Sequence, residues 1–167
     1  MPLRPLVLLT PSAAAAVELP RRLALTGRAL AGIYPMTLRD LARAVAEPVL
    51  LGQGLDVWDG GHGVLLAARL LEEDGPGGLR LPPDLPRRRV APALAATLTA
   101  LRRAGLDPAQ VQRLADRPRL GPEDAARLRA LARFYRRFHE TIDGRFADPV
   151  TLLRAAAAHL PEARWLQ

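Results

Sequence analysis

The chain begins with two short apolar runs, each followed by a hydroxyl-bearing turn and a helical pattern. Residues 6–9 form an apolar run of the strand type, and residues 13–25 have the composition of an alanine-rich helix. A second apolar stretch covers residues 30–34, and a new helical pattern begins near Thr37. The order strand, turn, helix, strand, turn, helix predicts an α/β unit at the start of the chain.

The turns that follow the two predicted strands carry the candidate site residues. Thr10, Pro11 and Ser12 follow the first strand, and Thr37 and Arg39 follow the second. Because a helix joins the strands, we expect them to be parallel and linked by a right-handed crossover. The carboxyl ends of parallel strands meet at one edge of a sheet, where α/β proteins bind ligands. Both turns are therefore expected at the same edge.

The pattern beyond residue 50 is mainly helical. Pro48, Gly52 and Gly54 are expected to end the first α/β unit. Further helices are expected after residue 61, from about 90 to Gly105, from 109, over 123–142 and from 149 to about 160, with a long loop over 75–86. The buried stripes expected on the first two of these helices are Val64, Leu65, Ala68 and Leu71, and Val90, Leu94, Thr97, Leu98 and Leu101.

These elements suggest three regions within one compact unit. Residues 1–50 form an α/β core segment, residues 51–145 a helical subdomain, and residues 146–167 a helix and the start of a returning core strand. A strand that starts at about residue 163 has little room before the chain stops. We therefore expect this chain to be a segment of a longer protein.

Composition narrows the class of protein. The chain has 167 residues, of which 49% are hydrophobic and 25% charged, which is enough for one core. No apolar stretch approaches the roughly 20 residues of a membrane span, and no signal peptide is recognisable, so no membrane association and a cytoplasmic location are expected. The net charge of +7 favours an anionic partner such as nucleic acid.

Missing residue types exclude several chemistries. All 24 cationic side chains are arginine, so a Walker A loop, a Schiff-base enzyme and a PD-(D/E)XK nuclease centre each lack their lysine. With no cysteine and three scattered histidines, Asp59 with His62 and the acidic run at 72–74 do not predict a metal site. Ser12, the single serine, lacks the glycines of a nucleophile elbow. We expect no catalytic residue, cofactor or metal in this chain.

The first forty residues resemble a known family. Leu-Leu-Thr-Pro-Ser, followed by an alanine-rich helix with Glu18, Arg21 and Arg22, resembles the segment after the P-loop in UvrD-like superfamily 1 helicases. Residues 34–42 are similar to the next element of that family, a strand ending in Thr-Phe-His-Ser-(Phe/Leu)-Ala, with Arg39 where the family often has His. Closer still is the N-terminal helicase-like part of AddB-type helicase-nuclease subunits and related PD-(D/E)XK nuclease-family proteins, in which the P-loop is degenerate or missing.

The resemblance extends more loosely toward the end of the chain. Residues 134–138, 145–148 and 152–153 are similar to the segment that precedes the Walker B strand, with Arg145 in place of the first Asp. The resemblance implies an α/β fold, with a small parallel sheet of P-loop-NTPase-like, degenerate helicase topology and a mainly helical insertion. It also implies that Thr10, Pro11, Ser12, Thr37 and Arg39 contact the backbone of single-stranded DNA during double-strand-break processing, beside a helicase-nuclease partner subunit.

Other interpretations stay open on sequence grounds. Ser12 can simply cap the helix that follows it, and Thr37 with Asp40 is a Thr-x-x-Asp capping pattern that needs no ligand. The chain is then a protein-interaction or scaffolding module whose helical middle docks a partner. A third interpretation is the motif-bearing half of an intact helicase ATPase whose P-loop precedes this stretch.

Overall fold

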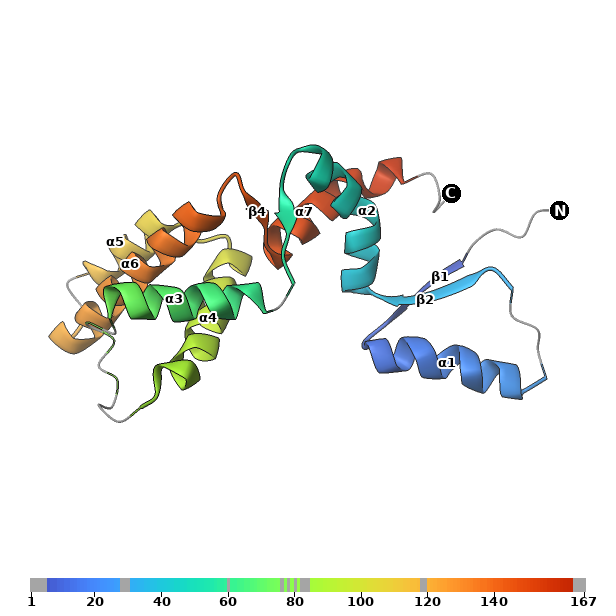
Figure 1. The fold of residues 1–167 in the computed structure, drawn as a ribbon, viewed down its shortest axis with the longest axis horizontal. Helices are drawn as coiled ribbons and strands as arrows, with labels where there is room; N and C mark the ends of the chain where they lie inside the picture. Colours follow the sequence, from blue (N-terminus) through green and yellow to red (C-terminus); the bar gives the residue numbers. More distant parts are fainter. Residues whose placement is uncertain are drawn as a thin grey trace. The chain divides into compact units, whose positions relative to one another are not determined.

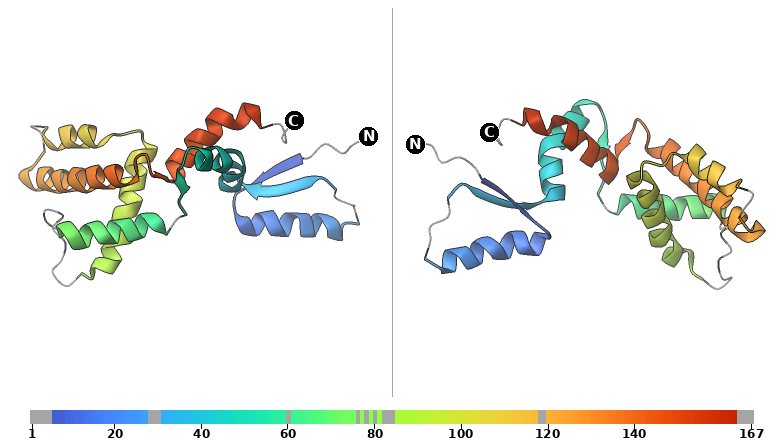
Figure 2. Two further views of the ribbon diagram at one scale, coloured as in Figure 1. Left: turned by 45° about the horizontal axis from the view of Figure 1, so that its top comes forward. Right: turned by 180° about the vertical axis from the view of Figure 1, so that it is seen from behind.

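The computed structural model describes residues 6–27, 31–59, 61–75, 77, 79, 81, 85–117 and 120–163. The chain divides into two compact units, one formed by Met1–Gly54 with Thr151–Gln167 and the other by Leu55–Val150. The described residues form an α/β structure that is mostly helical and contains short parallel strand pairs (Figures 1 and 2).

The first unit opens with two parallel strands. Strand β1 (Leu6–Thr10) leads into helix α1 (Ala13–Leu25), and strand β2 (Ile33–Thr37) pairs with β1. The register runs from Leu6 opposite Ile33 to Thr10 opposite Thr37. The predicted parallel pairing is therefore confirmed (Figure 1).

The second strand lies later in the sequence than predicted. We expected it at residues 30–34, but β2 covers Ile33–Thr37 and contains Pro35. Proline usually interrupts a strand because it lacks a backbone N–H, yet an edge strand tolerates it where that position faces away from the neighbouring strand. Pro35 occupies such a position, because the Leu6 N–H donates to the Gly32 carbonyl oxygen and the alternation along β2 then directs Pro35 away from β1.

Helix α2 (Leu38–Gly52) follows β2 directly and is longer than expected. Pro48 was expected to end this element, but it lies inside the helix. Proline removes one intrahelical hydrogen bond, and burial of an apolar face offsets that loss. The buried residues of α2 are Ala42, Val45, Ala46 and Leu50. Helix α7 (Pro149–His159), which ends in a short 3₁₀ turn (Leu160–Glu162), lies beside α2 in Figures 1 and 2.

The second unit is a helical assembly with one small strand pair. Its helices are α3 (His62–Asp74), α4 (Arg87–Arg103), α5 (Pro108–Ala115) and α6 (Pro122–Ile142). Strands β3 (Asp56–Val57) and β4 (Phe146–Ala147) pair in parallel. These two-residue strands were not predicted, because the sequence around them carries no alternating apolar pattern.

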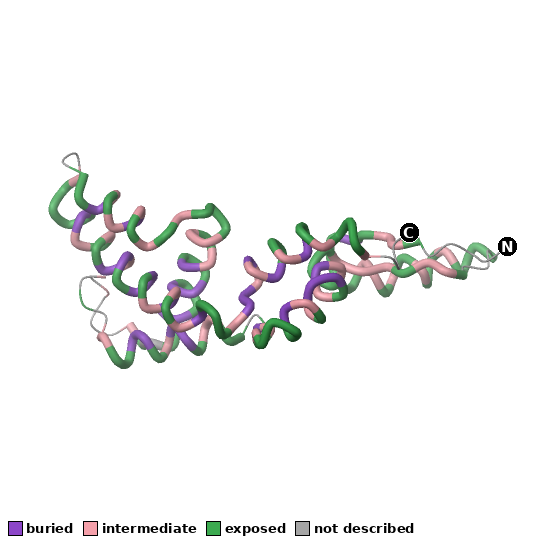
Figure 3. The backbone as a smooth tube through the Cα atoms, turned by 90° about the horizontal axis from the view of Figure 1, so that it is seen from above, coloured by how far each residue is buried: buried purple, intermediate pink, exposed green. Residues whose placement is uncertain are grey.

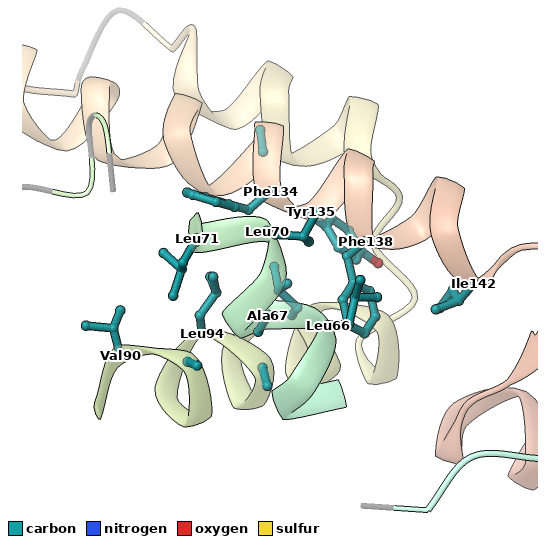
Figure 4. Packing of buried hydrophobic residues seen from close by; sticks show 14 of the residues in the cluster. Leu66, Ala67, Leu70, Leu71, Val90, Leu94, Phe134, Tyr135, Phe138 and Ile142 are labelled. Atoms are coloured by element: carbon teal, nitrogen blue, oxygen red, sulfur yellow. The ribbon is translucent and has the colours of Figure 1, made fainter. Parts of the chain in front are cut away.

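The core of the second unit is built from α3, α4 and α6. Its largest fully buried side chains include Phe134, Tyr135 and Phe138 of α6 (Figure 4). The phenol of Tyr135 donates a short hydrogen bond of 2.5 Å to the carbonyl oxygen of Leu106. Tyr135 therefore combines apolar burial with a satisfied polar end, as buried tyrosines generally do.

Two predicted stripes were partly wrong. Leu65 of α3 is 70% exposed, whereas Leu66, Ala67, Leu70 and Leu71 are buried. Thr97 of α4 is also exposed, and its hydroxyl donates to the carbonyl oxygen of Ala93 at 2.9 Å. When apolar residues are adjacent in a helix, the sequence pattern does not determine which side of the helix is buried. The neighbouring helices then determine the buried side. Residues 164–167 of the strand expected from residue 163, and half of the loop expected over 75–86, lie outside the described residues.

A buried ion pair connects distant segments of the second unit. Arg102, near the end of α4, donates from Nε to Oδ2 of Asp148 at 2.7 Å and from Nη2 to Oδ1 at 3.2 Å. The two side chains are 12% and 3% exposed. A bidentate arginine-carboxylate pair of this kind fixes geometry as well as charge. It ties the segment after β4 to helix α4.

Among the described helices, none combines the length and apolar character that crossing a membrane requires.

Candidate nucleic-acid interface

The two hydroxyl-bearing turns lie next to each other at one edge of the strand pair. Thr10 and Thr37 are direct partners in the parallel register. The Thr10 hydroxyl donates to the carbonyl oxygen of Met36 at 3.3 Å and to that of Ser12 at 3.1 Å. Thr10 is only 7% exposed, so its hydroxyl holds the two strand ends together rather than pointing to solvent.

Each turn continues into the N-terminus of a helix, where a side chain caps the first free N–H groups. The Ser12 hydroxyl oxygen accepts from the N–H of Ala15 at 3.2 Å. Thr37 and Asp40 form a reciprocal capping box, in which Thr37 Oγ1 accepts from the Asp40 N–H at 3.2 Å and Asp40 Oδ2 accepts from the Thr37 N–H at 3.0 Å. The capping interactions predicted for both turns are confirmed, and they use the hydroxyls of Ser12 and Thr37.

The two helix N-termini differ in charge. Helix α2 has Asp40 in its first turn, whereas α1 has no acidic residue there. Hydrogen bonds from the Thr37 hydroxyl, and then from the Thr37 N–H, lower the pKa of Asp40 from its ordinary value. The N-terminus of α2 therefore already holds a carboxylate, and the N-terminus of α1 is the better place for an external anion.

Arg39 is the one cation among the predicted site residues. It is exposed at the second position of α2, directly before the capping residue Asp40. Its charge contributes to lowering the pKa of Asp40, after the hydrogen bonds from Thr37. An exposed guanidinium beside two helix N-termini is suited to binding a phosphate group.

A hollow of about 450 Å³ lies beside the end of β1 and along one face of α1. Thr10 and Pro11 contribute to its lining, and an ion pair of 3.0 Å between Glu18 and Arg22 lies along it. Its other lining residues are Leu9, Ala14, Ala15 and Leu19. Sequence reasoning gave these α1 residues no role in a site, although their spacing of three and four places them on one helix face.

Several arginines outside this edge are engaged in ion pairs. Arg22 pairs with Glu18, Arg137 pairs with both Glu73 and Asp74, and Arg102 is buried against Asp148. Arginines held in this way contribute less to attracting a nucleic acid than their number suggests, because their charge is already balanced. The net charge of the chain is therefore weak support for any one binding surface.

The remaining candidate cluster has a structural role. Asp59 Oδ1 lies 2.8 Å from His62 Nδ1 and accepts from the N–H of Gly61 at 2.8 Å. The Gly61 N–H, and then His62, lower the pKa of Asp59. The His62 ring stacks on Trp58 at 5.6 Å between centroids. Within the described part of the chain, no group of three histidines, cysteines or carboxylates is placed to hold a metal ion.

Replacing Thr37 with valine is expected to raise the pKa of Asp40. The substitution removes the hydroxyl that is the main cause of the depressed pKa, while the backbone N–H remains. A depressed folded-state pKa stabilises the fold above the unfolded-state pKa of Asp40, and this stability is lost as the pH falls through the folded-state value. Carbon-13 NMR titration of the carboxyl group measures the shift. Thr26→Val, at the end of α1, is the control and should leave Asp40 unchanged.

The comparisons with known proteins give no family for this chain. No model of a known protein family matches the sequence, and no curated protein matches it either.

Proposed function

We propose that this chain is a non-catalytic, helicase-like segment of a DNA repair or recombination nuclease subunit, and that its two strand-exit turns hold the backbone of single-stranded DNA. The observation that carries the proposal is the direct register of Thr10 opposite Thr37. This register places the N-termini of α1 and α2 together at the carboxyl edge of a parallel strand pair, which is the usual ligand edge of α/β proteins.

The chemistry of this edge suits a phosphate backbone. Helix α1 begins without an acidic residue and presents the N–H groups of its first turn at Ala13 and Ala14. The guanidinium group of Arg39 adds a positive charge and N–H donors whose planar arrangement matches the oxygen atoms of a phosphate. Because both capping hydroxyls are already used, backbone N–H groups and Arg39 are the expected contacts, and these carry no base specificity.

The same features argue against ATP turnover by this chain. In the proposed P-loop-NTPase-like topology, nucleotide binding needs a glycine-rich loop and a lysine, and the sequence has neither after its first strand. The segment then serves to hold a DNA strand or to brace a motor subunit while double-strand-break ends are processed. The helical unit is the proposed insertion.

A second candidate function is a protein-interaction module, favoured by an apolar groove in the helical unit. The groove has a volume of about 280 Å³ and lies between α4 and α6. Its lining is apolar except for Thr97 and Arg127, and includes Leu79, Leu81, Val90, Ala93, Leu94, Leu128 and Leu131. In this alternative, the groove docks a partner subunit and the turns are only helix caps.

Binding to a fluorescent oligothymidine tests the DNA proposal. Two turns and a few arginines neutralise about 2 to 4 phosphates, so the log-log salt slope should be about −1.5 to −3 for single strands. The double variant Thr37→Val with Arg39→Ala should weaken binding and lessen this slope. Loss of the Thr37 cap costs on the order of 1 kcal/mol of stability, so circular dichroism must confirm folding.

A matched double variant provides the control. Thr97→Val with Arg88→Ala removes one hydroxyl and one exposed arginine from α4, which belongs to the second unit. It should bind the oligothymidine as the parent does. If the folded Thr37 and Arg39 variant binds as tightly as the parent with the same salt slope, the turns are only caps and the interaction-module function is the better account.

A further inference from the structure

The strand pair of the first unit leaves an unusual amount of apolar surface uncovered. Across β1, α1 and β2, Thr10 is the single buried residue among those described (Figure 3). Leu6 is 57% exposed, Leu9 51% and Tyr34 54%. Parallel sheets are normally covered on both faces, and a strand pair alone is marginally stable in water. This part of the fold is therefore expected to gain a further strand.

The hydrogen-bond pattern shows which edge can accept that strand. In a parallel pair, one residue directs both its N–H and C=O to the neighbouring strand, and the next directs both outward. The Leu6 N–H donates to the Gly32 carbonyl oxygen at 2.7 Å, so Leu6, Leu8 and Thr10 face β2. Val7 and Leu9 consequently direct their backbone groups outward, and no strand among the described residues pairs with them.

By contrast, the outer edge of β2 is blocked against pairing with a further strand. The same alternation directs Ile33, Pro35 and Thr37 outward from β1. Pro35 has no N–H, and the Thr37 N–H is bound to Asp40 Oδ2 at 3.0 Å. A proline and a satisfied donor are common means of blocking an edge strand against further pairing. The open edge is therefore that of β1.

The hollow along α1 lies beside this open edge. Leu9 of β1 lines it together with Ala15 and Leu19 of α1. A strand placed against β1 would lie over the hollow and direct alternate side chains into it. The open backbone groups and the apolar hollow are two independent features of one binding surface.

We propose that this surface is occupied by a second copy of the chain, whose β1 pairs antiparallel with the first about a two-fold axis at Leu8. Val7 of each copy then exchanges both backbone hydrogen bonds with Leu9 of the other, which gives four bonds. The result is a four-stranded sheet in the order β2, β1, β1, β2. This inference goes beyond the proposed function and does not depend on it.

The position of α1 fits a second copy. Helix α1 contacts both β1 and β2, so it covers the strand pair on one face. With strands about 4.8 Å apart, the two copies of α1 lie about 10 Å apart on the same face, which is the usual distance between packed helices. The symmetry makes the two helices antiparallel. Glu18 pairs with Arg21 and Arg22 of its own helix, so the facing surfaces carry balanced charge and the two copies do not repel each other.

Sedimentation equilibrium of the full chain tests this assembly. Between about 1 µM and about 100 µM, we expect a reversible shift from the monomer mass of 18.1 kDa toward twice that mass. Val7→Pro removes an outward N–H without touching the β1–β2 ladder, and it should weaken dimerisation at least about 10-fold because two of the four bonds are lost. Ile33→Pro, the same change on the closed edge, should leave the dimer unaffected.

A second pair of variants avoids any disturbance of the strands. Leu19→Glu places a charge in the hollow on both copies and should weaken the dimer, whereas Val17→Glu, on the opposite side of α1 and 73% exposed, should not. Circular dichroism checks that all four variants fold. A parent chain that remains monomeric throughout this range overturns the proposal, and so does an association weakened equally by the members of both pairs.

Discussion

Replacing Arg102 with methionine is expected to lower the free energy of unfolding by about 3 to 5 kcal/mol, the loss typical of a broken buried ion pair. Asp148 remains after the substitution, with its side chain only 3% exposed and without the guanidinium that contacts both carboxylate oxygens. Urea unfolding followed by circular dichroism measures the change. The effect is large because removing one member of a buried ion pair destabilises the buried charge that remains, not because the intact pair adds much stability.

A surface pair provides the control for Arg102. Arg129 and Asp116 form an ion pair of 3.3 Å with side chains 55% and 53% exposed. Arg129→Met should change the free energy of unfolding by less than about 1 kcal/mol, because solvent screens such pairs. Equal effects of the Arg102 and Arg129 substitutions would contradict the burial of the Arg102–Asp148 pair.

Replacing Phe138 with alanine is the second change with a large expected effect. Phe138 is 2% exposed, and its ring meets Trp58 edge-on with the centroids 6.4 Å apart. The cavity and the lost apolar burial together should cost about 3 to 5 kcal/mol. Urea unfolding measures the loss, and the tryptophan fluorescence of Trp58 should change as its neighbour is removed.

The control for Phe138 also tests which side of helix α3 is buried. Leu65 is 70% exposed, so Leu65→Ala should change the free energy of unfolding by less than about 0.5 kcal/mol. The stripe predicted from sequence placed Leu65 in the core instead. A loss of several kcal/mol on Leu65→Ala would favour the predicted stripe over the observed one.

Local signals explain most of what could be predicted from the sequence. Proline at the first helical position marked the starts of α5, α6 and α7 at Pro108, Pro122 and Pro149. The Thr-x-x-Asp spacing identified the capping box at the start of α2, and the strand-helix-strand order predicted the parallel pair. All of these features depend on residues close together in the chain.

The features that sequence reasoning missed depend on residues far apart in the chain. Arg102 and Asp148 are separated by 46 positions, and no local pattern indicates that they meet. Pro48 remains inside α2 because burial outweighs the broken hydrogen bond. Packing against α4 and α6 determines which side of α3 is buried, because apolar residues surround much of this helix.

The candidate site was predictable in position but not in chemistry. The parallel pairing follows from the connecting helix, and it brings Thr10 beside Thr37 as expected. The hydroxyls of Ser12 and Thr37 are used by helix caps, which leaves the free N–H groups of α1 and the Arg39 side chain as the groups offered to a ligand. Sequence spacing alone does not tell a capping hydroxyl from a ligand-binding one, because both occur at the same position of a turn.

An NMR titration with oligothymidine tests the proposed DNA contact most directly. Amide chemical shifts report each backbone N–H separately, so they distinguish the strand-exit turns from every other positive surface of the chain. The account predicts that the largest changes fall on residues 12–15 and 37–40, and that they diminish as salt is added. Changes concentrated on α4 or α6, or no change at the turns while binding occurs, would contradict the proposal that these two turns hold the DNA strand.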